Sequence, residues 1–509
     1  MPNTSGASQA TPATAFRRTD LVRSIFSFPV MCMFLLSAVI FGFCVKQFAE
    51  PDIWWHLRNA QNLVEFHSFS PVDTYSFTAA GLSRPNFEWL SEVPYYLAFK
   101  AWGLQGLLLV SIVVSVLIFA GVYYLCCRWG ADCKDAVIAT MLAISLGVVS
   151  IGPRMLLFGW LCMVVLLILL DVYRCTGKGL WVIPPLFLLW INLHGSWAFG
   201  MVVFAIFIIS GLVEGEWGLL VARRWNRSQL RNLLLAGVAA FVLLFVNPFG
   251  YKLVVYPFEV AARQQAAVQY VEEWQPVDLS TGNGKLALLV IFAIMASVLL
   301  SRRRWRLDVA LLIAFALWTA LSHTRFLFFL GLIAAPLLAP YIHLFTPYEP
   351  EDDKPWLNAS IMAGVVVALC LLFPSRASLQ QKVEHEFPAA ALRFMQEHQL
   401  NGRVFNQYVW GGFMEWNTPE LKTFIDGRAD VFVANGVLAD HRKVTTIEEP
   451  LEVLDKYRID YALLQQDRPL TYVLRNSKEW RPIYSDPVAV LLARTTPVAT
   501  ATQPSAEVK

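Results

Sequence analysis

Residues 103–126 read GLQGLLLVSIVVSVLIFAGVYYLC and contain no Asp, Glu, Lys or Arg. A helix needs about 20 predominantly apolar residues to cross the hydrocarbon core of a bilayer, so this stretch predicts a membrane-spanning helix. Similar runs recur along the chain and predict an α-helical polytopic membrane protein with about 11 spans. The predicted spans are residues 26–47, 103–126, 135–152, 155–171, 180–194, 197–213, 232–247, 285–300, 307–321, 326–345 and 356–373.

The composition of the 509 residues supports this fold class. Hydrophobic residues make up 56% of the chain and charged residues only 16%, whereas a soluble domain carries about 25% charged residues. The net charge of +3 is too small to favour a nucleic-acid partner, and we expect none. None of the eight cysteines lies in the long polar segment near the C-terminus. The sequence therefore predicts no disulfide framework, and it contains no CxxC zinc pattern.

Basic residues gather on one side of the predicted spans. They precede the first span and follow the second, fourth, sixth and eighth spans. Because loops rich in Lys and Arg stay in the cytoplasm, the N-terminus is predicted to be cytoplasmic. An odd number of spans then places the C-terminal segment on the non-cytoplasmic side. These residues are Arg17, Arg18, Arg23, Arg128, Lys134, Arg174, Lys178, Arg223, Arg224, Arg227, Arg231, Arg302, Arg303, Arg304 and Arg306.

The chain divides into four predicted segments. We expect a disordered cytoplasmic N-terminus at 1–25, a transmembrane domain at 26–373 with a long first outer loop at 48–102, an α/β domain at 374–495 and a disordered tail at 496–509. Within the α/β domain, the pattern predicts a helix over 389–398 and strands over 403–406, 423–425, 461–464 and 488–492.

The first outer loop begins with PDIWWHL at residues 51–57. In a helix, Asp52 and His56 fall on one face and Ile53 and Leu57 on the opposite face. Such a helix would lie along the membrane and present an acid and an imidazole to water, with its two tryptophans at the level of the lipid headgroups. The alternative is that Asp52 only caps the N-terminus of this helix.

Two further acids of the first outer loop are candidates for the site. Asp73 stands in PVDTYS and is expected to be a turn acid. Glu88 lies between Phe87 and Trp89, which are surroundings that an ordinary surface acid does not need. We therefore expect Glu88 to contribute to the site.

Polar residues also lie where predicted spans meet the outer side. Ionisable groups at membrane depth are costly, so they suggest a function. Arg154 and Arg325 could bind a phosphate or pyrophosphate, and His194 and His323 could donate to a leaving phosphate, although each could instead be a snorkelling or structural residue. Because several spans contribute, we expect one outward-facing vestibule. The residues are Arg154, Asn192, His194, Asn247, His323 and Arg325.

The α/β domain contains FIDGRAD at residues 424–430. Asp426 and Arg428 follow a predicted strand, and loops at strand ends often bind ligands. These two residues could therefore bind an acceptor, or they could form a structural turn with an internal ion pair. Gly411 and Gly412 predict a turn or helix start that another segment approaches closely.

This combination resembles the GT-C superfamily of membrane glycosyltransferases, which use polyprenyl-phosphate-linked sugars. More narrowly, it is similar to bacterial GT-C-like proteins with an Asp-x-Trp-Trp-His first loop and a C-terminal extramembrane domain. The resemblance covers residues 26 to 495. It is sharpest at Asp52–Leu57, Glu88–Leu90, Asn192–Gly195, Asn247–Gly250 and Asp426–Arg428.

The resemblance implies an enzyme of the cytoplasmic (inner) membrane with a periplasmic C-terminal domain. It implies transfer of a sugar, with inversion, from a lipid-linked donor to a glycan, lipid or protein acceptor on the non-cytoplasmic face. Membrane lipids would surround the spans. In these enzymes an acid near the start of the first outer loop is functional, and Asp52 corresponds to it. Many members carry a paired Asp-x-Asp or Glu-x-Asp where this chain has Asp52-Ile53-Trp54, so a divalent metal cofactor is left open.

The roles implied for the side chains follow from that reaction. Asp52 is expected to be the general base, with His56 or Glu88 assisting it or binding sugar hydroxyls. Arg154 and Arg325 are expected to stabilise the charge on the leaving phosphate.

Two other functions remain compatible with the sequence. A flippase or transporter of lipid-linked precursors is one, although the chain shows no inverted repeat of the kind common in transporters. A non-enzymatic membrane scaffold with a periplasmic binding domain is the other. A scaffold would depend on Gly411 or Asp426 and would tolerate replacement of Asp52.

Overall fold

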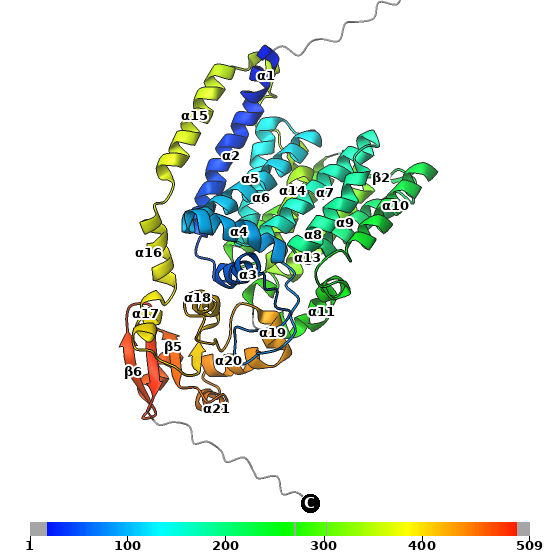
Figure 1. Cartoon of the computed structure of the whole chain (residues 1–509). Helices are drawn as coiled ribbons and strands as arrows, with labels where there is room; N and C mark the ends of the chain where they lie inside the picture. The colour runs from blue at the N-terminus through cyan, green and yellow to red at the C-terminus, as the bar shows by residue number, and fades with distance from the viewer. Residues whose placement is uncertain (1–17, 269–270, 302, 496–509) are drawn as a thin grey trace, which may run out of the picture.

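The computed structural model describes residues 18–268, 271–301 and 303–495. It shows a helical membrane domain joined to a smaller α/β domain (Figure 1). The predicted disordered tail at 496–509 lies outside the described residues, as do residues 1–17. The prediction of disorder is wrong for the rest of the N-terminus, because Arg18–Ile25 form helix α1 directly before the first span.

A helix lies at each predicted span. By length and composition, seven helical segments of the described residues could cross a membrane, and three shorter apolar helices accompany them. The helices at the predicted spans are α2 (Phe28–Lys46), α5 (Leu104–Arg128), α6 (Cys133–Gly147), α7 (Leu156–Thr176), α8 (Ile183–Leu193), α9 (Trp197–Ser210), α10 (Arg227–Leu243), α12 (Gly282–Leu300), α13 (Leu307–Ser322), α14 (Leu327–Leu338) and α15 (Pro355–Leu372).

The centre of the membrane domain is α14, in which every residue is buried. It packs against α5, α6 and α13. Small residues allow these close approaches, as is usual between membrane helices. A Cβ at Gly147 would come within 2.9 Å of the Phe328 ring, and a Cβ at Gly331 would come within 3.1 Å of the Ala143 carbonyl oxygen.

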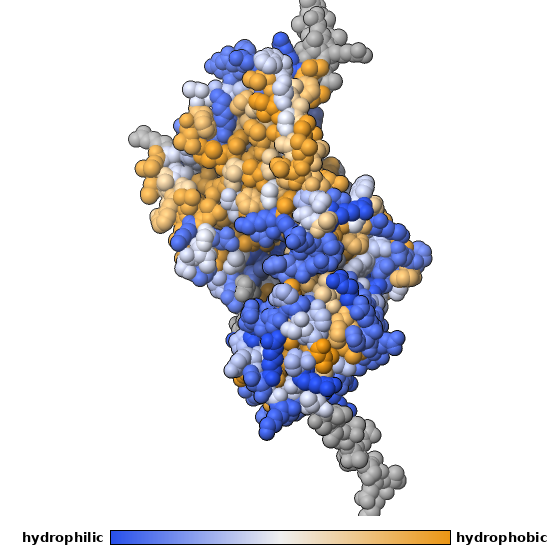
Figure 2. All heavy atoms as spheres, turned by 90° about the vertical axis from the view of Figure 1, so that its left-hand side faces the viewer, coloured by the Kyte–Doolittle hydropathy of each residue, from blue (hydrophilic) through white to orange (hydrophobic). Residues whose placement is uncertain are grey.

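The surface of the helical half is apolar. Figure 2 shows hydrophobic residues dominating this half, whereas the α/β half is mostly hydrophilic. On α15, which lies beside α2, Val367 is 56% exposed and Leu371 is 80% exposed. A helix that exposes such residues is solvated by lipid. It continues into α16 (Arg376–Glu386), which leads to the α/β domain (Figure 1).

The α/β domain is built on a four-stranded sheet in the order β4-β5-β7-β6. β4 (Val404–Asn406) is parallel to β5 (Tyr461–Gln465), and β7 (Ala489–Arg494) is antiparallel to β5 and to β6 (Trp480–Ser485). The predicted strand at 423–425 is wrong, because Thr423 forms only an isolated bridge with the first outer loop. The helices are α17 (Ala389–Glu397), α18 (Gly411–Asn417), α19 (Ala429–Ala434), α20 (Val437–Thr445), α21 (Pro450–Lys456) and α22 (Pro469–Arg475).

Buried ion pairs join the helix ends on the side that carries the basic clusters. Asp171 accepts from Arg128 at 2.7 Å, and Asp308 accepts from Arg306 at 2.7 Å and lies 3.3 Å from Arg174. Pairing offsets the cost of burying these charges, so the network holds α5, α7 and α13 in register. A small sheet that the sequence did not predict lies next to it, formed by β1 (Gly215–Trp217), β2 (Leu220–Ala222) and β3 (Trp305–Arg306).

The first outer loop lies between the two domains. Its helices are α3 (Ile53–Phe66) and α4 (Trp89–Trp102) (Figure 1). The prediction that Trp54 and Trp55 lie at the lipid headgroups is wrong, since they are only 5% and 3% exposed. The Trp54 ring packs edge-on against Phe413 of the α/β domain, with centroids 5.0 Å apart. The first half of α3 is therefore buried between the two domains, whereas Phe66 at its end is exposed.

Candidate functional site

Asp52 lies at the start of α3, where both domains meet. Its backbone is already helical and its side chain accepts no capping hydrogen bond, so the interpretation of Asp52 as a cap is wrong. The carboxylate lies instead against Gly427 of the α/β domain, where a Cβ would stand 1.7 Å from Asp52 Oδ1. Burial raises the pKa of Asp52 above that of an ordinary aspartate, against the opposing charges of His56 and Arg154. A carboxylate of this kind is suited to accept a proton.

His56 lies one helical turn after Asp52 and is buried. Its Nδ1 is 2.8 Å from Glu92 Oε1. Glu92 also accepts from the side-chain amides of Asn59 at 3.0 Å and Asn86 at 2.8 Å. Because Glu92 is the acceptor for Nδ1 of His56, Nε2 of the same ring is turned toward Glu88, 3.8 Å away. Glu92 therefore fixes the orientation of the imidazole.

Glu88 joins the first outer loop to the end of α8. His194 Nε2 is 3.2 Å from Glu88 Oε1, and the backbone N–H of Ser196 donates to His194 Nδ1 at 2.9 Å. Since Nδ1 accepts, Nε2 carries the proton and donates to Glu88. Burial opposes ionisation of Glu88, but the His194 hydrogen bond and the nearby His56 and Arg84 outweigh it and lower its pKa to about 2. Glu88 is thus a fixed negative charge.

Arg154 is held between two carboxylates that the sequence did not single out. It donates to Glu50 at 2.5 Å and to Glu273 at 2.6 Å, and also to the Val149 carbonyl oxygen at 3.1 Å. Burial raises the pKa of Glu50, although the Arg154 charge works in the opposite direction. With both carboxylates bound, Arg154 is not an open anion ligand.

Arg325 differs from Arg154 in its surroundings. It lies on η4 (Thr324–Phe326), with its guanidinium 4.5 Å from the centroid of the Trp274 ring. Among the described residues, no carboxylate lies within ion-pair distance of Arg325. It is nevertheless close enough to Asp52, Glu88 and Glu273 for their charges to act on it. Arg325 is therefore a cation near several acids and forms an ion pair with none of those that the structure describes.

The other candidate histidine lies near this cation. The His323 ring stands edge-on to Trp274, with centroids 6.0 Å apart. The His323 ring also stands edge-on to Phe326, with centroids 5.8 Å apart, and the charge of Arg325 acts on it. The structure thus places His323 at the edge of the site and His194 at Glu88.

The two asparagines stabilise the local backbone. Asn192 accepts from the Trp89 indole at 3.1 Å and donates to the Leu188 and Val246 carbonyl oxygens at 2.8 and 3.1 Å. Asn247 holds a turn, in which its side chain bonds to the backbone of nearby residues. Both side chains have their hydrogen bonds within the protein, so their role here is structural.

Asp426 and Arg428 form the internal pair that the structural interpretation of FIDGRAD predicts. Arg428 Nε donates to Asp426 Oδ1 at 2.7 Å, and its guanidinium also binds Asp73 of the first outer loop. Asp73 is therefore more than a turn acid, because it is an ion-pair partner across the domain interface. A second such pair joins Arg84 to Asp430 at 3.0 Å.

Tyr408 is a residue of the α/β domain that sequence analysis missed. Its hydroxyl donates to the Gly427 carbonyl oxygen at 2.9 Å. The charges of Asp52, Asp426 and Asp430 reach the Tyr408 hydroxyl and, together with burial, raise its pKa. The α/β domain therefore contributes Tyr408 and Gly427 to the surroundings of Asp52.

The donor set does not fit a divalent metal. Within the described residues, no three His, Cys, Asp or Glu side chains are arranged to hold an ion. Glu88 accepts from His194, and Glu50 and Glu273 are bound to Arg154, whereas Mg²⁺ is usually bound through carboxylates together with water.

The chain was compared with known proteins in three ways. A scan against protein-family models found no match, and a search of curated proteins found no similar sequence. Among solved structures, the chain is similar to the oligosaccharyltransferase of Archaeoglobus fulgidus in its apo form, with a TM-score of 0.49 and 13% sequence identity. The match covers 85% of this chain and 69% of that chain. The function is therefore argued from the site itself.

The pKa of Glu88 generates a prediction about stability. Because its folded-state pKa of about 2 lies below that of an unfolded glutamate, ionised Glu88 stabilises the fold above about pH 4.3, and this contribution is lost as the pH falls toward 2. Replacing Glu88 by Gln should lower the free energy of unfolding at neutral pH by roughly 1–3 kcal/mol. Thermal unfolding in nanodiscs measures this difference between pH 7 and pH 3.5, where it should shrink.

The matched control is Glu397→Gln, at an exposed residue of α17. We expect no pH-dependent difference for this variant. A Glu88→Gln difference that stays constant down to pH 3.5 would contradict the assignment of Glu88 as a buried anion.

Proposed function

We propose that the chain is a membrane glycosyltransferase that moves a sugar from a polyprenyl-phosphate-type lipid donor to an acceptor on the non-cytoplasmic face. The observation that carries the proposal is the pairing of two roles in residues close enough for their charges to interact. Asp52 is a carboxylate with a raised pKa, and Arg325 is a cation without a bound carboxylate among the described residues. A transfer of this kind needs a base for the acceptor and a cation for the leaving phosphate.

The positions of Asp52 and Arg325 suit a lipid-linked donor. Asp52 follows α2, and Arg325 lies on η4 between α13 and α14, so both lie where apolar helices end. A polyprenyl chain would stay in the hydrocarbon while its phosphate reaches Arg325 at the interface. Because the Lys and Arg clusters lie at the opposite helix ends, the non-cytoplasmic side is favoured for Asp52 and Arg325.

The chemistry is a direct displacement. The acceptor hydroxyl or amide is deprotonated by Asp52 as its heteroatom bonds to the anomeric carbon, while the bond from that carbon to the phosphate oxygen breaks on the opposite face. The proton passes to Asp52, and the electron pair leaves with the phosphate, which Arg325 stabilises. Attack from the face opposite the leaving group inverts the anomeric configuration.

The supporting residues have different tasks in this scheme. Arg154 is already paired with Glu50 and Glu273, so Arg325 is the primary phosphate ligand. Glu88 and His56 are placed to bind sugar hydroxyls, because Glu88 is an acceptor of fixed charge and His56 is oriented by Glu92. The proposal includes a polyprenyl chain as the lipid of the sugar donor and the cytoplasmic membrane as the place of the enzyme.

Asp52→Asn tests the base directly. The substitution keeps the shape and removes the proton acceptor, so transfer should fall about 10²–10⁴-fold. In the wild-type protein, the acid limb of the pH–rate profile should lie above the pKa of an ordinary aspartate, because only ionised Asp52 accepts the proton. The measurement is release of polyprenyl phosphate from a panel of lipid-phosphate sugars, with cell-envelope extract as acceptor. Undiminished transfer by the folded variant removes Asp52 from the mechanism.

Gly427→Ala tests whether the α/β domain positions this base. The new methyl group would stand 1.7 Å from Asp52 Oδ1, so the carboxylate must move. A shift of about 1 Å can cost about 10²-fold in rate. We expect kcat to fall by that order, the KM for the donor to change little and the acid limb of the pH–rate profile to move.

Gly364→Ala is the control, because a Cβ at Gly364 meets nothing within 4 Å. It should leave kcat unchanged. If Gly427→Ala also leaves kcat and the pH profile unchanged, the contact between Gly427 and Asp52 has no catalytic role.

A further inference from the structure

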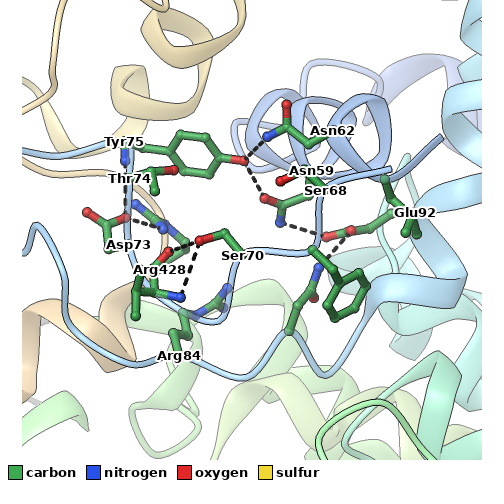
Figure 3. Close-up of a pocket in the computed structure, with 14 residues that line it drawn as sticks. Asn59, Asn62, Ser68, Ser70, Asp73, Thr74, Tyr75, Arg84, Glu92 and Arg428 are labelled. Atoms are coloured by element: carbon green, nitrogen blue, oxygen red, sulfur yellow. Dashed lines mark hydrogen bonds and ion pairs between the residues drawn. The ribbon is translucent and has the colours of Figure 1, made fainter. Parts of the chain in front are cut away.

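A pocket lies within the first outer loop, and Arg428 of the α/β domain completes its wall. Its volume is about 50 Å³, several times the about 10–15 Å³ that one water molecule requires. Asp52, Arg154 and Arg325 do not line it, so it is distinct from the groups assigned to the transfer. Half of the residues that line it carry an amide or a hydroxyl, and those used below are Asn86 and, as labelled in Figure 3, Asn59, Asn62 and Tyr75.

The two cations at this pocket are already neutralised. Arg84 donates to Asp430 at 3.0 Å, and Arg428 binds Asp73 and Asp426. A phosphate or carboxylate ligand would have to displace a carboxylate from a buried guanidinium, which is unfavourable. The wall therefore favours a neutral ligand.

Glu92, the other acid of the wall besides Asp73, has its hydrogen bonds within the protein. Glu92 accepts from His56, Asn59 and Asn86, as Figure 3 shows for the amide of Asn59. A cationic ligand would compete with all three donors. Because Glu92 also orients His56, it connects the pocket with the transfer site.

The neutral groups of the wall are held in fixed orientations. The Tyr75 hydroxyl donates to Asn59 Oδ1 at 2.6 Å and accepts from Asn62 Nδ2 at 3.0 Å (Figure 3). Among the described residues, Asn62 Oδ1 has no hydrogen-bond partner. Phe69 adds an aromatic face to the lining. Fixed amides beside an aromatic ring suit a group with hydroxyls on its edge and C–H bonds on its face.

We infer that this pocket binds the edge of a neutral sugar residue of the acceptor, so that the acceptor is a glycan. The inference rests on the proposed function in one respect: the donor sugar is held by its phosphate at Arg325, and the pocket is left for the other substrate. Binding there supplies affinity remote from the reacting atoms, which positions the acceptor group at Asp52.

The test measures binding to the full-length protein in nanodiscs by saturation-transfer NMR. The probes are the methyl glycosides of glucose, galactose, mannose and N-acetylglucosamine, with inorganic phosphate as a competitor. We expect at least one glycoside to bind, and Asn62→Ala to weaken it about tenfold, which is about 1.4 kcal/mol. Asn62→Gln should restore part of the affinity, and Asn476→Ala, at an exposed helix end, should change nothing.

Binding is measured in the Asp52→Asn background as well, where it should persist. Failure of every glycoside to bind, equal affinity of Asn62→Ala and wild type, or displacement of the glycoside by phosphate would each overturn the inference. If the glycosides bind as expected while no lipid-linked sugar is turned over, the pocket stands and the proposed transfer fails. If transfer occurs without glycoside binding, the transfer stands and the glycan acceptor fails.

Discussion

The balance of buried charges at the membrane boundary is the constraint on which the site depends. Removing an ion from water costs several kcal/mol even after the protein relaxes, so each buried charge needs partners. Glu50 and Glu273 share Arg154, and Glu88 accepts from His194. Once these groups are paired, Arg325 is left near these acids without an ion-pair partner within the described part of the chain. The proposed reaction uses Arg325 to stabilise the leaving phosphate.

The α/β domain is part of the site and does not merely cover it. Gly427 can approach the Asp52 carboxylate only because it lacks a Cβ, and Tyr408 binds the Gly427 carbonyl oxygen. The ion pair between Arg428 and Asp73 joins this domain to the first outer loop in a buried setting. The environment that raises the pKa of Asp52 therefore depends on the docking of a segment nearly 400 residues later in the chain.

The sequence predicted most of the fold because length and hydropathy alone indicate membrane helices, as at residues 103–126. It also placed Asp52, Glu88, Arg154 and Arg325 on one side, and the structure brings them together. It could not show that Arg154 is bound by Glu273, since that acid lies in a polar connection with no periodic pattern. Gly427 was quoted within FIDGRAD, but nothing local in the sequence signals a contact with Asp52. Thr423 looked like part of a strand because Phe424 and Ile425 follow it, whereas its bridge is an isolated one with Ser76.

The central claim is that Asp52 and Arg325 face one bound lipid phosphate at the outer boundary of the membrane. The most direct measurement is a cryo-electron microscopy structure of the protein in nanodiscs with a polyprenyl phosphate. The account predicts phosphate density against the Arg325 guanidinium, on the same side of the membrane as Asp52, with Arg154 still bound to Glu50. Phosphate density at the helix ends that carry Arg128 and Arg306, with none at Arg325, would contradict it.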